Sequence, residues 1–137
     1  VDSEDMVHIA WHDERWPTGP GPINAYITYT KIDPSRDDQD GDVADEMQIT
    51  VVDDIVIANV WWAQNPRMAV DQNDNLHIVF EEHDTGVYYM QLDNNNATVN
   101  VAPILLKDLS STIAWRSSID VAVDSDNNPH IAWNDID

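Results

Sequence analysis

A short sequence motif occurs three times in this chain, and it limits the possible folds more than any other feature does. Residues 70–80 read V-D-Q-N-D-N-L-H-I-V-F, and residues 123–133 read V-D-S-D-N-N-P-H-I-A-W. Residues 1–11, V-D-S-E-D-M-V-H-I-A-W, form a third copy. Internal self-similarity of this kind indicates one supersecondary unit per copy, with neighbouring units burying each other's apolar faces. We therefore expect a repeat architecture rather than a single irregular core.

The copies differ in spacing because the first one carries insertions. Asp2, Asp71 and Asp124 mark the three copies, which lie 69 and then 53 residues apart. Two loop insertions in the first copy, of nine and seven residues, account for the difference. The whole chain, 1–137, is then one repeat region. Its expected parts are a partial first unit at 1–61, a complete unit at 62–114 and the first two strands of a further unit at 115–137.

Each unit reads as a series of short β-strands. Residues 76–82 alternate, so that His77 and Val79 share one face of the strand and Ile78 lies on the other. Strands are expected at 7–13, 24–32 and 47–53 in the first unit, and at 68–71, 76–82, 87–92 and 101–107 in the second. No window has an apolar period of 3.6 residues, so we expect almost no helix.

The repeat resembles a known family. The pattern Ala-Val-Asp-x-x-x-Asn-x-His-Ile-x-Trp, followed by a strand with two tyrosines at 88–89, is similar to the BNR-like or sialidase-like β-propeller repeats of secreted and surface proteins. The family's Asp-box, Ser-x-Asp-x-Gly-x-Thr-Trp, is not intact, because 124–133 has neither its Gly nor its Thr. The resemblance implies an all-β fold of four-stranded antiparallel propeller blades. A little over two blades are present, which favours a fragment or a part of a larger assembly.

The chain is strongly acidic, and most of its acids are aspartates. It has 26 Asp and Glu against 6 Lys and Arg, for a formal net charge of -20, and 21 of the acids are Asp. This charge repels phosphate backbones and anionic head groups, so we expect no nucleic-acid partner. No apolar run is long enough for membrane insertion. Two interpretations of the acidic bias stay open, a halophilic surface adapted to high salt and an extracellular or cell-surface protein that binds calcium.

The insertion at 33–46 contains the clearest candidate site. Its sequence, D-P-S-R-D-D-Q-D-G-D-V-A-D-E, alternates aspartates around Gly41. Calcium takes about six to eight oxygen ligands, and alternating carboxylates with a glycine turn supply several from one segment. The predicted metal ligands are Asp38, Asp40, Asp42 and Asp45. The alternative is a disordered acidic loop without a metal.

A histidine recurs at one strand position of every copy. The three residues are His8, His77 and His130. A shared metal ion is one interpretation, but a repeat places equivalent residues on successive units, where they are commonly too far apart to hold one ion. We therefore expect interior histidines that bond to a neighbouring blade.

The aspartate near the start of each motif is expected to serve its own turn. Asp2, Asp71 and Asp124 are each followed by a run of polar turn-forming residues. Asp side chains commonly accept hydrogen bonds from backbone N–H groups two residues further on. This predicts capped turns rather than weak cation sites.

The tryptophans fall into two groups. Those at repeat positions are expected in the core between units, because each ring buries on the order of 200 Å². They are Trp11, Trp61, Trp62, Trp115 and Trp133. Trp16 lies instead beside Arg15 in the Pro- and Gly-rich insertion of the first unit. Arg15 and Trp16 are predicted to contact a carbohydrate or a neighbouring subunit.

The remaining motifs favour a protein outside the cell without a catalytic site of its own. Asn96 begins an Asn-Ala-Thr sequon, which predicts glycosylation. Sialidase-like catalysis would need clustered arginines and a tyrosine activated by Glu. Only four arginines are present, of which Arg36 lies in the acidic loop, while Arg67 and Arg116 fall on different units. We expect a non-catalytic structural or ligand-binding module whose partners are other blades or copies of the same protein. The alternatives are a fragment of a sialidase-like glycoside hydrolase and a subunit that polymerises through incomplete blades.

Overall fold

The structure is a computed structural model that describes residues 1–15, 24–32, 49–55, 63–82, 85–93, 98–108 and 118–134. Within these ranges the chain forms nine β-strands and no helix, which confirms the all-β prediction. The strands are β1 (Val7–Arg15), β2 (Asn24–Ile32), β3 (Ile49–Ile55), β4 (Ala63–Val70), β5 (Leu76–Glu82), β6 (Gly86–Asp93), β7 (Thr98–Asp108), β8 (Ile119–Val123) and β9 (Pro129–Trp133). In this part of the chain, no helix could span a membrane.

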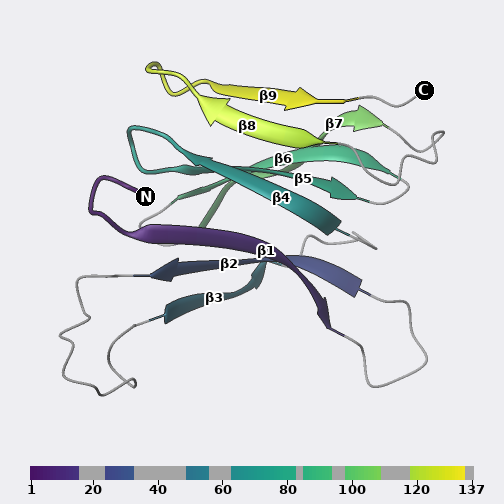
Figure 1. The fold of residues 1–137 in the computed structure, drawn as a ribbon, viewed down its shortest axis with the longest axis horizontal. Helices are drawn as coiled ribbons and strands as arrows, with labels where there is room; N and C mark the ends of the chain where they lie inside the picture. The colour runs from purple at the N-terminus through teal and green to yellow at the C-terminus, as the bar shows by residue number, and fades with distance from the viewer. Residues whose placement is uncertain are drawn as a thin grey trace.

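The strands form three antiparallel sheets, one for each copy of the motif (Figure 1). The first sheet has the order β1-β2-β3, the second β4-β5-β6-β7 and the third β8-β9. Strands that follow one another in the sequence are paired, so each sheet is a meander. The sheets lie face to face as three layers, and the described strands do not close into a ring or barrel (Figure 1).

The second sheet packs on a different neighbour with each of its faces. On one face, Ile78 and Phe80 of β5 belong to a buried cluster with Tyr29 of β2. On the other face, Val79 belongs to a second cluster with Val121 of β8. The predicted alternation along β5 therefore separates two cores, because successive side chains of a strand point to opposite faces.

We name the two faces of each sheet by these residues. The front face carries Ile78 and Phe80, or the equivalent residues of the other copies, and packs on the preceding sheet. The back face carries Val79 and Tyr89, or their equivalents, and packs on the following sheet. Every interface in the stack thus joins the back face of one sheet to the front face of the next.

The first strand of the second sheet begins earlier than the sequence predicted. A strand was expected only at 68–71, whereas β4 runs over Ala63–Val70. Asn65 has a positive φ of 52°, and the pairing register shifts between Gln64 and Arg67. Pro66 between them has no backbone N–H to donate. A bulge of this kind interrupts the alternation on which the prediction relied.

Two tryptophans that were expected in the core are exposed. Trp11 and Trp133 are accessible to solvent, although Phe80 at the same motif position is fully buried. Trp11 lies on the front face of the first sheet, which no sheet in the described ranges covers. Trp133 lies at the end of β9, beside an open pocket. The prediction is wrong for these two residues, and the remaining ones at repeat positions, Trp61, Trp62 and Trp115, lie outside the described residues.

Candidate functional site

The turn in each motif copy is held together by its first aspartate. Asp71 Oδ1 accepts hydrogen bonds from the backbone N–H groups of Asn73 and Asn75, both at 2.8 Å. Asp2 and Asp124 each accept the same two bonds in their own turns, at 2.9–3.0 Å. The prediction of self-capped turns is confirmed, and each carboxylate also holds a second N–H group four residues further on.

The fourth residue of each turn has a left-handed backbone. Its φ is 62° at Asp5, 62° at Asp74 and 65° at Asn127. Asp and Asn adopt this conformation at lower cost than other residues with a Cβ atom, because their short polar side chains can bond locally. The turn geometry therefore explains why one of these two residue types fills the position in all three copies.

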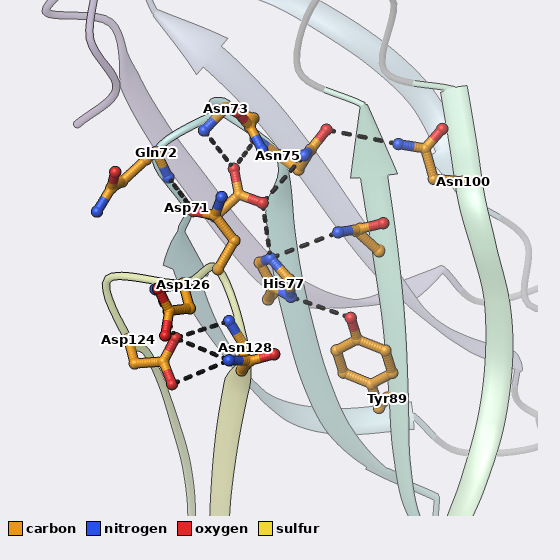
Figure 2. Close-up of polar contacts among 12 residues, drawn as sticks. Asp71, Gln72, Asn73, Asn75, His77, Tyr89, Asn100, Asp124, Asp126 and Asn128 are labelled. Carbon is orange, nitrogen blue, oxygen red and sulfur yellow. Dashed lines mark hydrogen bonds and ion pairs between the residues drawn. The ribbon is translucent and has the colours of Figure 1, made fainter.

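The other oxygen of the same aspartate bonds to the recurring histidine (Figure 2). Asp71 Oδ2 lies 3.2 Å from Nε2 of His77, and Nδ1 of His77 lies 3.0 Å from the hydroxyl oxygen of Tyr89. We call this chain of carboxylate, imidazole and phenol the Asp–His–Tyr cluster. The first sheet repeats it, with corresponding distances of 3.0 and 2.6 Å, in Asp2, His8 and Tyr29.

The third copy has only the first part of the cluster. Nε2 of His130 lies 3.0 Å from Asp124 Oδ2, but no tyrosine among the described residues contacts this histidine. The side chain of His130 is 68% exposed, compared with 1% for His8 and 2% for His77. The cluster is thus complete and buried in the first two sheets, and open in the third.

Hydrogen bonding and burial together assign the protons of the buried clusters. An ionised carboxylate can only accept, so it takes the Nε2–H of the histidine, and Nδ1 then accepts the phenol O–H. Burial lowers the pKa of His8, although the nearby Asp2 opposes this effect. Burial, helped by the charge of Asp2, raises the pKa of Tyr29 to about 12. The imidazole of His8 and the phenol of Tyr29 are therefore both neutral at physiological pH.

The aspartates of the clusters are ionised. Burial by itself raises the pKa of Asp71, but hydrogen bonds from Asn75, His77 and Asn73 outweigh it, so the pKa lies below its ordinary value. In the third sheet, the hydrogen bond from His130 is the largest of several that lower the pKa of Asp124. In the first sheet, Nζ of Lys31 lies 3.5 Å from Asp2 Oδ2 and balances its charge.

The chemistry of the buried clusters favours structure over catalysis. A carboxylate–imidazole–hydroxyl chain is also the arrangement of an acid–base relay. Here, however, both nitrogens of His8 and His77 are engaged, and both side chains are closed off from solvent. A buried polar network in which every member has a partner makes packing specific, because any displaced arrangement leaves groups unsatisfied.

The sequence prediction for the histidines is right about burial in two copies and wrong about the partners. His8 and His77 are interior, but each bonds to an Asp and a Tyr of its own sheet instead of a neighbouring one. Within the described ranges, no group of three His, Cys, Asp or Glu side chains is placed to hold a metal ion.

The missing partner had a signal in the sequence. Tyr29 aligns with Tyr89, and each pairs across the sheet with the residue two positions after the histidine. This diagonal position brings the phenol to Nδ1, but it becomes visible only when the register of the strands is known. Of the two adjacent tyrosines of β6, Tyr88 lies on the other face and stacks on Phe80 with ring centroids 5.4 Å apart, and both tyrosines are partly buried.

Most residues predicted to contact ligands lie outside the described ranges. These are the calcium-loop residues Asp38, Asp40, Asp42 and Asp45, together with Trp16 and Asn96. Arg15 is the last residue of β1, where it pairs with Asn24 of β2. Their roles remain predictions.

An open pocket lies between the second and third sheets. Its volume is about 470 Å³, and its lining includes Arg67 of β4, Asp120 of β8 and Trp133 of β9. An indole ring with a nearby guanidinium and carboxylate is a combination that sugars and polar peptides can both use. The pocket was not predicted, because it depends on contact between strands far apart in the sequence.

Comparison with known proteins identifies no family, so the class of this protein is defined by its fold and its Asp–His–Tyr clusters. No family model, curated protein or solved structure matches the chain. The observed class is an all-β protein of antiparallel sheets, with a repeated Asp–His–Tyr cluster at the interfaces between the sheets.

Proposed function

We propose that this chain is a non-catalytic structural module of a secreted or cell-surface protein, built from β-propeller-type blades. The observation that carries the proposal is the burial of the Asp–His–Tyr cluster on the back face of two successive sheets. In each case the cluster lies beneath the next sheet, and all three of its side chains have partners. The role of the cluster is to hold the turn, the second strand and the third strand of a unit in one register.

The layer arrangement supports blades over other repeat units. The second sheet is a four-stranded antiparallel meander, the form that a propeller blade takes. The sheets stack back face to front face, so that each unit contacts only its neighbours. In this proposal the first and third sheets are parts of further blades.

Calcium and an extracellular location belong to the same proposal. The donors that the sequence offers at Asp38, Asp40, Asp42 and Asp45 are all carboxylates, which suit a hard cation. Modules outside the cell bind calcium with dissociation constants of about 10⁻⁴–10⁻³ M, which matches the calcium available there. Arg15 and Trp16 would supply a contact for a carbohydrate.

A matched pair of substitutions tests the structural role of the cluster. His77→Gln removes the imidazole from a buried cluster, whereas His130→Gln makes the same change at an exposed one. We expect His77→Gln to lower the free energy of unfolding by about 1–3 kcal/mol and His130→Gln by less than about 0.5 kcal/mol. Urea denaturation followed by tryptophan fluorescence measures both values. Equal, small losses would contradict the proposal.

A separate measurement tests the calcium assignment. The unfolding temperature should rise when calcium replaces chelator, because a ligand that binds only the folded state stabilises it. The double variant Asp40→Asn, Asp42→Asn should lose this rise, whereas Asp120→Asn, in the third sheet, should keep it. Identical unfolding temperatures in calcium and chelator would remove calcium from the proposal and leave the structural role in place.

A further inference from the structure

Hydrogen bonds join the turn of each sheet to the turn of the next. The backbone N–H of Ser3 donates to Asp74 Oδ1 at 2.8 Å, and the Ser3 hydroxyl donates to Asp74 Oδ2. One unit further on, the backbone N–H of Gln72 donates to Asn127 Oδ1 at 2.9 Å. The side chain of Gln72 adds a bond to the carbonyl oxygen of Ser125 at 3.1 Å. The three turns lie on the same side of the molecule (Figure 1).

These turn-to-turn hydrogen bonds follow one rule. The donor is the second residue of a turn, and the acceptor is the side chain of the fourth, left-handed residue of the next turn. The contact is therefore directional, and a directional contact can be repeated without limit or until a ring closes. Among the described residues, one donor position and one acceptor position of this series make no turn-to-turn hydrogen bond. They are the backbone N–H of Ser125 and the carboxylate of Asp5.

The stack of sheets likewise ends in two faces that no described sheet covers. On the back face of the second sheet, Ala69 packs against the third sheet. Its equivalent Ala122, on the back face of the third sheet, is exposed. At the other end of the stack, the front face of the first sheet exposes Ile9 and Trp11 to solvent. One molecule therefore carries both halves of an interface that it already forms twice internally.

We propose that a second copy of this chain docks head to tail, with the back face of the third sheet of one copy on the front face of the first sheet of the other. Ser125 of one copy donates to Asp5 of the next through its N–H and its hydroxyl. This pair has the same two residue types as Ser3 and Asp74, so both hydrogen bonds of that contact can form. The inference rests on the proposed structural role and adds the partner and its contact.

Docking in this direction also closes the open cluster. His130 and Asp124 lie on the back face of the third sheet, where His8 and His77 are covered in the other copies. The first sheet of the second copy would cover them in turn. β9 of one copy and β1 of the next carry the same strand of the motif. Because the copies stack face to face and do not exchange strands, each strand stays in its own sheet and the two do not compete for one position.

Electrostatics gives the association a salt dependence. Each copy has a formal charge of -20, so two copies repel each other at low ionic strength. The screening length falls from about 10 Å at 0.1 M salt to about 3 Å at 1 M. Association should therefore strengthen as sodium chloride is raised, the opposite of an interface built on salt bridges.

Cysteine cross-linking tests the contact directly, because the chain has no cysteine of its own. The double variant Ser3→Cys, Asp74→Cys should form a disulfide within one chain, as an internal control for the turn-to-turn geometry. A mixture of the single variants Ser125→Cys and Asp5→Cys, oxidised in high salt, should give several-fold more disulfide-linked dimer than either variant alone. Mass spectrometry distinguishes the mixed dimer from the two symmetric ones.

The two cross-links separate the failure of this inference from the failure of the proposed function. A disulfide within the double variant, with no excess of the mixed dimer, would overturn head-to-tail docking and leave the stacked module intact. Absence of the internal disulfide would contradict the stacking of the sheets, and both proposals would fall.

Light scattering in high salt, with matched variants, provides the second test. Asp5→Gly suits the left-handed backbone but removes the acceptor, whereas Asp5→Asn keeps an acceptor of the kind that Asn127 provides. Wild type and Asp5→Asn should associate as concentration rises, and Asp5→Gly should stay monomeric. Ala122→Lys on the exposed back face should also abolish association, whereas Ala102→Lys on β7 should not. A monomeric wild type, or equal association of all four variants, would overturn the inference.

Discussion

The second and third sheets contain the same motif in two different surroundings. The distance from Asp Oδ2 to His Nε2 is 3.2 Å between Asp71 and His77 and 3.0 Å between Asp124 and His130, so the local contact is nearly identical. The two side chains of the second sheet are each 2% exposed, whereas those of the third are 68% exposed for the histidine and 36% for the aspartate. The turn alone therefore forms the Asp–His contact, and the neighbouring sheet decides whether it is buried.

Because of this difference, the same motif contributes differently to the free energy of unfolding in the second and third sheets. Where the cluster is buried, loss of any partner leaves a polar group without solvent or protein to satisfy it, which costs about 1–3 kcal/mol. Where it is open, water replaces the lost partner. Substitutions at equivalent positions of the two sheets should therefore differ in effect even when the residues and contacts are alike.

The largest difference is expected for the aromatic residue of the motif. Phe80→Ala removes a fully buried ring that stacks on Tyr88, and it should lower the free energy of unfolding by about 3–5 kcal/mol. Trp133→Ala, at the equivalent exposed position, should cost less than about 1.5 kcal/mol, although tryptophan is the larger residue. Chemical denaturation of both variants makes the comparison. A loss in Trp133→Ala as large as that in Phe80→Ala would contradict the difference in burial between these two motif positions.

The next largest difference is expected at the turn aspartate. Asp71→Ala leaves two backbone N–H groups and a buried imidazole without their acceptor, for a loss of about 2–4 kcal/mol. Asp124→Ala removes the same bonds at an exposed turn, where water can replace them, and should lower the free energy of unfolding by clearly less than Asp71→Ala does. Thermal and urea unfolding measure both changes. Equal losses would mean that the turn, and not burial, sets the contribution of the aspartate.

A smaller effect is expected for the phenol. Tyr89→Phe removes only the hydroxyl that bonds to Nδ1 of His77, and it should lower the free energy of unfolding by about 1 kcal/mol. In a protein that already carries His77→Gln, the same change should cost less, because the two groups act through one contact. Additive losses in this double-mutant cycle would contradict the assigned cluster.

The smallest effect is expected from pH. The pKa of His8 is lowered in the folded state, mainly by burial, so the unfolded chain binds more protons as pH falls below the ordinary value of 6.5. Stability should therefore decline as the solution is acidified through this range. The ionisable groups around His8 are Asp2, Tyr29, Lys31 and the N-terminal amino group, and none of them has an ordinary pKa between about 5 and 7.5. His8→Gln should flatten the decline, and unfolding free energies measured from pH 7.5 to 5 would detect an unchanged slope.

The sequence contained the local parts of this architecture. The motif copies located the turns, and alternation located strand β5, since both signals depend on residues close together in the chain. Asp2 and Asp71 were assigned to their turns for the same reason. The start of β4 was missed because the bulge at Asn65 and Pro66 breaks the alternation that marks a strand.

Features that depend on register or on neighbouring sheets were not predictable in this way. The phenol of Tyr89 reaches His77 only because β6 pairs with β5 in one register. Trp11 is exposed because it lies on a front face that no described sheet covers, although its motif position is buried in the second sheet. Tertiary context therefore changed the role of identical motif positions.

The turn-to-turn hydrogen bonds place an uneven limit on how such units can diverge after duplication. The donor is a main-chain group, so residues as different as Ser3 and Gln72 fill its position, and only proline is excluded by its chemistry. The acceptor must combine a side-chain oxygen with a left-handed backbone, which restricts Asp74 and Asn127 to a narrow choice. Substitutions can therefore accumulate at the second turn residue, the donor, while the fourth turn residue, the acceptor, stays Asp or Asn. The fourth turn residue should be the more durable marker of common descent among units of this kind.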